Sequence, residues 1–140
     1  MNKVLKKSKT SKKKIIKIIK NTKKYKVKLP IKFKSNWIKA LKSGKYKQTT
    51  AGNLLDSDGY CCLGVAATIC EIGKKHLFGR GFLTNVNCIK TDKKNILFNK
   101  IRTRIPKDLR DNSTLQEDLA SMNDKGDSFI KIAKYIEKNL

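Results

Sequence analysis

The first quarter of the chain is a dense block of positive charge. Residues 1–35 hold fifteen lysines and no acidic residue. Lysines at this density repel one another, and a segment of this composition buries too little apolar surface to fold alone. We therefore expect residues 1–30 to be a basic arm that orders only on a partner, with Pro30 at its end. Residues 31–140 are then long enough to fold as one globular domain.

The type of positive residue narrows the choice of partner. Of the 34 Lys and Arg residues only four are arginines, so the net charge of +23 comes almost entirely from lysine. A lysine ammonium is a hydrated point charge and lacks the planar fork with which arginine reads its partners. The composition therefore predicts attraction to the phosphate backbone of nucleic acid without sequence recognition. The lysines expected to contact phosphate groups are Lys6, Lys7, Lys9, Lys12, Lys13, Lys14, Lys17, Lys20, Lys23 and Lys24.

The arm also shares features with targeting segments. Its isoleucine run at residues 15–19 is interrupted by Lys17, is too short to span a membrane and lacks the continuous apolar stretch of a secretory signal. The lysine cluster of residues 6–14 would serve equally well for import into the nucleus of a eukaryotic host. We rank contact with nucleic acid or another anionic surface first, nuclear import second and organelle import third.

The spacing of apolar residues predicts the helices of the domain. Apolar positions three and four residues apart favour helices over residues 37–43, 60–72 and 128–140, with Ser128 as the N-cap of the last. A capping box beginning at Thr114 opens a further helix. The full pattern predicts an α+β domain of about three helices packed on a small antiparallel sheet.

Turn residues and alternation predict the remaining elements. Ser35 or Asn36 is the expected N-cap of the first helix. Residues 56–59 have the composition of a tight turn, and residues 45–50 favour a strand or extended turn before it. Residues 74–104 contain glycines and alternating segments, which predict one or two hairpins.

The cysteines favour buried free thiols. Cys61, Cys62, Cys70 and Cys88 include no C-x2-C pair and His76 is the sole histidine, so we expect no metal site. Without a secretion signal a disulfide framework is disfavoured, and a virion or a reducing host cytoplasm is the expected location. A cysteine nucleophile with His76 as its base is an alternative, but a lone histidine in a basic loop is more often solvated. We expect no catalytic residue and no cofactor.

Two further residue sets have a structural and a functional interpretation. Trp37, Tyr46, Tyr60 and Cys62 form a candidate pocket, although a small domain needs its aromatic residues mainly for packing. Aromatic side chains of this kind could also stack on single-stranded nucleic acid. The acidic residues suggest metal or acid/base chemistry, but Asp-Ser-Asp-Gly also satisfies turn hydrogen bonds, and we expect that role. These acidic residues are Asp56, Asp58, Asp124 and Asp127.

Three segments together resemble a known group of proteins. They are residues 37–48 (WIKALKSGKYKQ), 58–65 (DGYCCLGV), and 122–129 (MNDKGDSF) leading into 132–140 (IAKYIEKNL). In this order and spacing they resemble a family of small, mostly uncharacterised proteins encoded by bacteriophages and some other large DNA viruses. The resemblance implies a viral origin and a shared α+β fold, assigns no catalytic residue and leaves the arm outside.

The charge and the resemblance together predict a function. We expect a non-enzymatic viral basic protein that binds nucleic acid through its arm and is associated with the genome or the virion. One alternative is a structural or cement protein whose arm threads between the subunits of an anionic assembly such as a capsid. Another is a host-directed inhibitor or small-molecule-binding protein that uses the candidate pocket.

Overall fold

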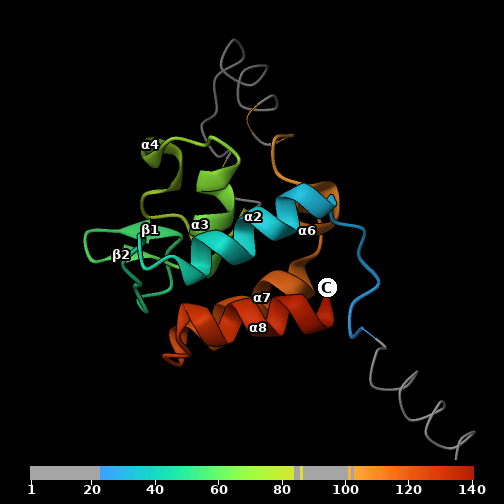
Figure 1. Ribbon diagram of the computed structural model, residues 1–140. Coiled ribbons are helices and arrows are strands. Elements are labelled where there is room, and N and C mark those ends of the chain that lie inside the picture. The colour runs from blue at the N-terminus through green and yellow to red at the C-terminus, as the bar shows by residue number, and fades with distance from the viewer. Residues whose placement is uncertain (1–22, 84–85, 87–100, 102) are drawn as a thin grey trace, which may run out of the picture.

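A computed structural model describes residues 23–83, 86, 101 and 103–140 of the chain (Figure 1). Residues 1–22 of the predicted arm, with its lysines up to Lys20, lie outside the described residues, as does the larger part of the hairpins predicted over residues 74–104. In chain order the elements are α2 (Ile31–Lys42), β1 (Leu55–Asp56), β2 (Gly59–Tyr60), α3 (Cys62–Ile69), α4 (Lys74–Leu77), α6 (Lys107–Arg110), α7 (Ser113–Asp124) and α8 (Phe129–Asn139).

The α+β class predicted from the sequence is confirmed. The described residues form six helices and one two-stranded antiparallel sheet. The sequence predicts about three helices. Two of the six observed helices, α4 and α6, are four-residue turns, too short to show a periodic apolar pattern, and the other four lie in the segments where the sequence favours helices. None of the described helices is long and apolar enough to cross a membrane.

The sheet is a tight hairpin at the predicted turn. Leu55 pairs with Tyr60 and Asp56 with Gly59, which leaves two residues in the loop. The Asp56 carboxylate closes this loop by accepting hydrogen bonds from the backbone N–H groups of Asp58 and Gly59. The extended segment at Gln48 runs parallel to Tyr60, in agreement with the strand or extended turn predicted over residues 45–50.

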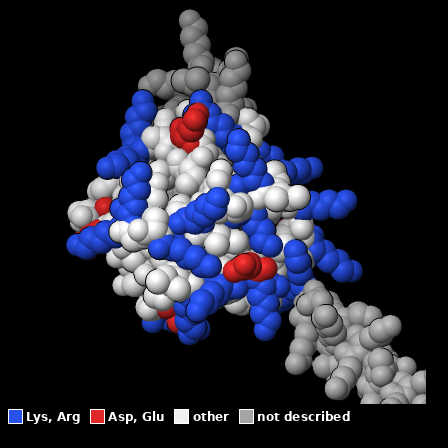
Figure 2. Space-filling view, in the orientation of Figure 1, with Lys and Arg blue, Asp and Glu red and all other residues white. Residues whose placement is uncertain are grey.

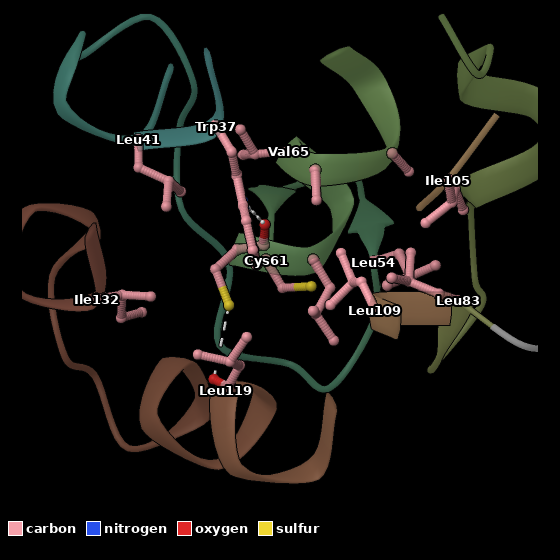
Figure 3. Close-up of a cluster of buried hydrophobic side chains, with 14 of the residues drawn as sticks. Trp37, Leu41, Leu54, Cys61, Val65, Leu83, Ile105, Leu109, Leu119 and Ile132 are labelled. Atoms are coloured by element: carbon pink, nitrogen blue, oxygen red, sulfur yellow. Dashed lines mark hydrogen bonds between the residues drawn. The ribbon is translucent and has the colours of Figure 1, made fainter. Parts of the chain in front are cut away.

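Helix α3 lies at the centre of the domain. Six of its eight residues are buried, which explains its nearly uncharged sequence. Helices α2 and α7 both pack on α3, and α2 also packs on α8 (Figure 1). Figure 3 shows the resulting core, with Trp37 of α2 and Leu119 of α7 on opposite sides of the Cys61 region. The indole N–H of Trp37 donates a hydrogen bond of 3.0 Å to the carbonyl oxygen of Cys62.

Several predicted helix starts are wrong. Helix α2 begins directly after Pro30, so Ser35 and Asn36 lie inside it. Pro30 is the N-cap residue, and its carbonyl oxygen accepts a hydrogen bond of 3.0 Å from the N–H of Lys34. Helix α7 is capped by the side chain of Asn112, which accepts a hydrogen bond from the N–H of Leu115, and not by Thr114.

Helix α3 and the segment after it also differ from the sequence prediction. Tyr60 belongs to β2 and the Cys61 sulfur caps α3 by accepting a hydrogen bond from the N–H of Gly64, so the helix is shorter than the predicted 60–72. At the start of the predicted hairpins, Lys74–Leu77 is a helical turn. In contrast, α8 starts after its predicted cap Ser128 and buries the predicted apolar stripe.

The described part of the predicted arm is packed against the domain. Tyr25, Val27 and Leu29 are half-buried against the core, whereas Lys24, Lys26 and Lys28 between them are exposed. This alternation is that of an extended segment with one side on the protein. The folded unit therefore includes residues 23–30, which the sequence predicts to be part of the arm.

Candidate functional site

Lysines from residues 23–42 gather on one face of the domain (Figure 2). This lysine face consists of Lys23, Lys28, Lys32, Lys34, Lys39 and Lys42. Residues 23–42 contain eight lysines and no acidic residue. Figure 2 shows blue side chains spread over this region with few red ones between them. The fold thus places the ammonium groups of these six lysines on one surface of the domain.

The packing of α2 points its lysines outward. Trp37 and Leu41 are the buried residues of this helix and face the core. Lys32 and Lys39 are seven residues apart, which places them on the same side of the helix, and both are exposed. Lys42 lies 3.8 Å from the carboxylate of Glu137 on α8, so the face borders the end of α8.

Two lysines of the face meet at the C-terminal end of α8. Lys23 Nζ donates to the carbonyl oxygen of Leu140 at 3.1 Å, and Lys34 Nζ donates to that of Glu137 at 3.5 Å. Carbonyl groups at the end of a helix carry partial negative charge and attract cations. Burial, followed by the nearby charge of Lys23, lowers the pKa of Lys34. The ammonium groups of Lys23 and Lys34 are therefore near each other at the end of α8, and their combined charge attracts an anion to this position.

A hydrogen-bonded cluster fixes residues 23–29 beside α2 and α8. The Tyr25 hydroxyl donates to the carboxylate of Asp118 on α7 and lies 3.2 Å from the hydroxyl of Tyr135 on α8. The hydrogen bond from Tyr25 lowers the pKa of Asp118, and the charge of Lys24 acts in the same direction. The N–H of Lys28 donates to Asp108 at 2.6 Å. These contacts hold Lys23 and Lys28 in place on the lysine face.

A groove of about 590 Å³ runs between residues 23–29, α2 and the end of α8. Its aliphatic lining is provided by Val27, Leu29, Ile31, Ile38 and Leu140, and its charged lining by Lys23, Lys28, Lys34, Lys39 and Glu137. The groove therefore joins an aliphatic floor to a rim with four cations and one anion.

The candidate pocket predicted from the sequence is part of the core. Trp37 and Cys62 are fully buried, and the hydrogen bond from the indole to the Cys62 carbonyl uses the one polar group of Trp37. The rings of Tyr46 and Tyr60 pack edge to face with centroids 5.2 Å apart. Tyr46 and Tyr60 are half-buried against the core, and none of the four residues lines the groove. The position of these four residues is explained by their role in packing the domain.

The cysteine thiols lie in surroundings that disfavour a nucleophile. Cys61 and Cys62 are buried, and Cys62 Sγ donates to the carbonyl oxygen of Leu119 at 3.5 Å. Burial raises the pKa of Cys61 to about 11 and that of Cys62 well above its usual value. A reactive thiol requires the opposite shift. Cys88 lies outside the described residues.

This environment predicts slow alkylation of both thiols. At pH 8 a thiol whose pKa is near 11 is about 0.1% thiolate. We expect iodoacetamide to modify Cys61 and Cys62 at least ~100-fold more slowly in the native protein than in urea. Peptide mass spectrometry of samples quenched over time measures both rates. Modification in the native state at a rate close to that in urea would instead support an enzyme with a cysteine nucleophile.

The acidic residues take part in local structure. Asp56 accepts a hydrogen bond from the Thr49 hydroxyl, which is the main reason why its pKa is lowered. Asp127 pairs with Lys131 one turn later in the chain, at 3.0 Å. In the part of the chain that the structure describes, no three His, Cys, Asp or Glu residues are grouped so that they could hold a metal ion.

Sequence reasoning missed the role of Asn123. Its side chain is fully buried and accepts hydrogen bonds from Gln48 Nε2 at 3.0 Å and from the N–H of Cys62 at 3.2 Å. It also donates to the carbonyl oxygen of Thr49 at 2.7 Å. Asn123 thus joins the segments on which the viral resemblance depends. The sequence indicated this role only in that residues 37–48, 58–65 and 122–129 occur together in the resemblance.

Comparison with known proteins identifies a family. No curated protein and no solved structure matches the chain. Residues 29–140 match a domain family whose description is a domain of unknown function, DUF8296. The match begins just before α2 and includes every helix and strand that the described residues form. The chain therefore belongs to the DUF8296 family.

Proposed function

We propose that the protein binds the phosphate backbone of nucleic acid without sequence preference and is not an enzyme. The lysine face is the observation that carries this proposal. It presents six lysines from residues 23–29 and α2 on one side of a folded domain, and α2 contains no acidic residue. The described residues thus offer a fixed cationic surface in addition to the charge of the arm.

The chemistry of lysine supports phosphate contact over base reading. Each ammonium group that replaces a condensed counterion on the nucleic acid releases that ion, and the entropy gained drives binding. Recognition of base edges is dominated by arginine, asparagine and glutamine side chains that bind in pairs of hydrogen bonds. The ammonium groups of the lysine face lack this paired geometry. The arm lysines from Lys6 to Lys20 would add phosphate contacts of the same kind.

The setting that we propose is viral, with the protein held on the packaged genome or inside the virion. The resemblance of residues 37–48, 58–65 and 122–140 to viral proteins supports this proposal. Reduced, buried cysteines suit a virion interior or a reducing cytoplasm. A capsid or another anionic assembly is negatively charged, as nucleic acid is. It would become the proposed partner if the chain showed no salt-dependent binding to DNA.

Charge removal from the lysine face tests the proposal. We expect the triple variant Lys32→Gln, Lys39→Gln, Lys42→Gln to bind a random 30-base-pair DNA duplex about tenfold more weakly at low salt, because three phosphate contacts are lost. The slope of log K against log salt should fall by about 2 to 3, at about 0.9 per contact. Fluorescence anisotropy over a series of salt concentrations measures both quantities.

A matched variant separates local contact from net charge. Lys74, Lys75 and Lys125 are exposed and lie outside the lysine face. Their triple substitution by glutamine removes the same charge and should change affinity by less than about threefold. Equal losses in both variants would mean that only the total charge matters. No salt-dependent binding by the unaltered chain would refute the proposal.

A further inference from the structure

The aliphatic floor of the groove is not explained by phosphate binding. Ile31 is 89% exposed, although it stands at the first position of a stable helix, and Val27, Leu29 and Ile38 lie beside it in the groove. An exposed large apolar side chain at a concave site often marks an interaction surface. Bases of nucleic acid stack on aromatic rings, and no aromatic residue lines this groove.

The charged rim limits the partner to an anion. Four lysines and one glutamate line the groove, and the ammonium groups of Lys23 and Lys34 lie near each other at the end of α8. A carboxylate placed between them would relieve their mutual repulsion and gain two charge-assisted hydrogen bonds. The isoleucine run of the chain's own arm is flanked by Lys14, Lys17 and Lys20, so the rim would repel it.

The shape of the groove favours a peptide over an acyl chain. A lipid tail gains most from an enclosed cavity because it has no polar group to leave in water. Here Ile31 remains open to solvent at the edge of the site. A peptide segment can bury its aliphatic side chains on the floor while its backbone and other side chains stay hydrated.

We propose that this groove binds a segment of a partner protein in which aliphatic and acidic side chains lie on one side. The aliphatic residues contact Ile31 and Ile38, and a carboxylate lies between Lys23 and Lys34. A volume of about 590 Å³ fits a few side chains, so the segment is short. This partner is distinct from nucleic acid and the proposal does not depend on nucleic-acid binding. Because Lys23, Lys28, Lys34 and Lys39 belong to both surfaces, the segment would compete with any nucleic acid bound there.

Two matched pairs of variants in the full chain test this proposal. The probe is a fluorescein-labelled twelve-residue peptide with four leucines and four glutamates separated by serines. We expect Ile31→Ser to weaken its binding about tenfold, since an aliphatic contact is lost, and Ile130→Ser to weaken it less than twofold. Ile130 is 53% exposed and lies outside the groove, so it serves as the matched control. Lys34→Gln should likewise weaken binding more than Lys134→Gln, which changes an exposed lysine outside the groove.

Altered probes show which chemistry the groove recognises. A peptide with its leucines changed to serine, and another with its glutamates changed to glutamine, should each bind at least about tenfold more weakly. Equal binding of the leucine-free peptide, or equal effects of Ile31→Ser and Ile130→Ser, would overturn the proposal and leave a non-specific charge effect. Ile31-dependent binding to phosphatidylglycerol vesicles without peptide binding would overturn it in favour of a membrane surface. Ile31→Ser should change the affinity for duplex DNA by less than about twofold. A failure of the peptide-binding proposal can therefore be distinguished from a failure of the proposed nucleic-acid binding.

Discussion

Replacing Asn123 by alanine is expected to lower the free energy of unfolding by about 4 kcal/mol, the largest effect that we predict. The alanine removes the acceptor of the buried N–H of Cys62 and the donor to the carbonyl oxygen of Thr49. Each buried polar group left without a partner costs about 1 to 3 kcal/mol, and the smaller side chain also leaves a cavity. Urea unfolding followed by tryptophan fluorescence measures this loss, because Trp37 is the only tryptophan.

A second asparagine provides the control for this measurement. Asn36 lies in α2 and is exposed. Asn36→Ala removes the same amide and raises helix propensity, so its stability should change by less than about 1 kcal/mol. A loss of less than about 1 kcal/mol in Asn123→Ala would mean that Asn123 is not the centre that joins residues 37–48, 58–65 and 122–140.

Replacing Gly64 by alanine is expected to lower the free energy of unfolding by about 3 kcal/mol. Gly64 lies in α3 against the chain segment that precedes β1. A Cβ atom on Gly64 would overlap the carbonyl group of Leu54, whose carbon would lie only 2.8 Å away. Both partners belong to buried backbone, so the clash is relieved only by moving α3 away from this segment. Urea unfolding measures the change.

Gly81 provides the matched control for this substitution. A Cβ atom there would meet only the carbonyl oxygen of Gly52 at 3.7 Å, an ordinary van der Waals contact. Gly81→Ala should therefore leave stability within about 1 kcal/mol, and its smaller unfolded-state entropy acts in the stabilising direction. If Gly64→Ala were as stable as Gly81→Ala, the close packing of α3 on Leu54 would be refuted.

Local signals in the sequence predicted the elements whose stabilising contacts are also local. The stripe of α8, its cap at Ser128 and the turn at Asp56 all depend on residues fewer than a dozen positions apart, and the structure confirms each. The starts of α2 and α7 were predicted wrongly because more than one residue near each start is of a type that begins helices. In α7, Asn112 precedes Ser113 and Thr114, and all three are residue types that cap helices.

The candidate site was only partly accessible to sequence reasoning. The amount and type of charge in residues 1–35 predicted a cationic surface. The lysines of residues 23–30 alternate with Tyr25, Val27 and Leu29, and this period of two is typical of a segment with one face packed. Residues 23–30 were nevertheless assigned to the arm. The groove was not predicted, because it forms where segments about 100 residues apart meet.

The net charge, the residue type that carries it and the α+β class follow from composition and short-range periodicity, which can be read from the amino-acid sequence. Tertiary structure alone decided which lysines share a face, because the position of Lys23 beside Lys34 depends on hydrogen bonds to the carbonyl oxygens of α8. It likewise decided that Asn123 joins distant segments. Such contacts are specified by packing across the whole core. The stabilisation of the core is shared among many residues, so no single position in the sequence indicates these contacts.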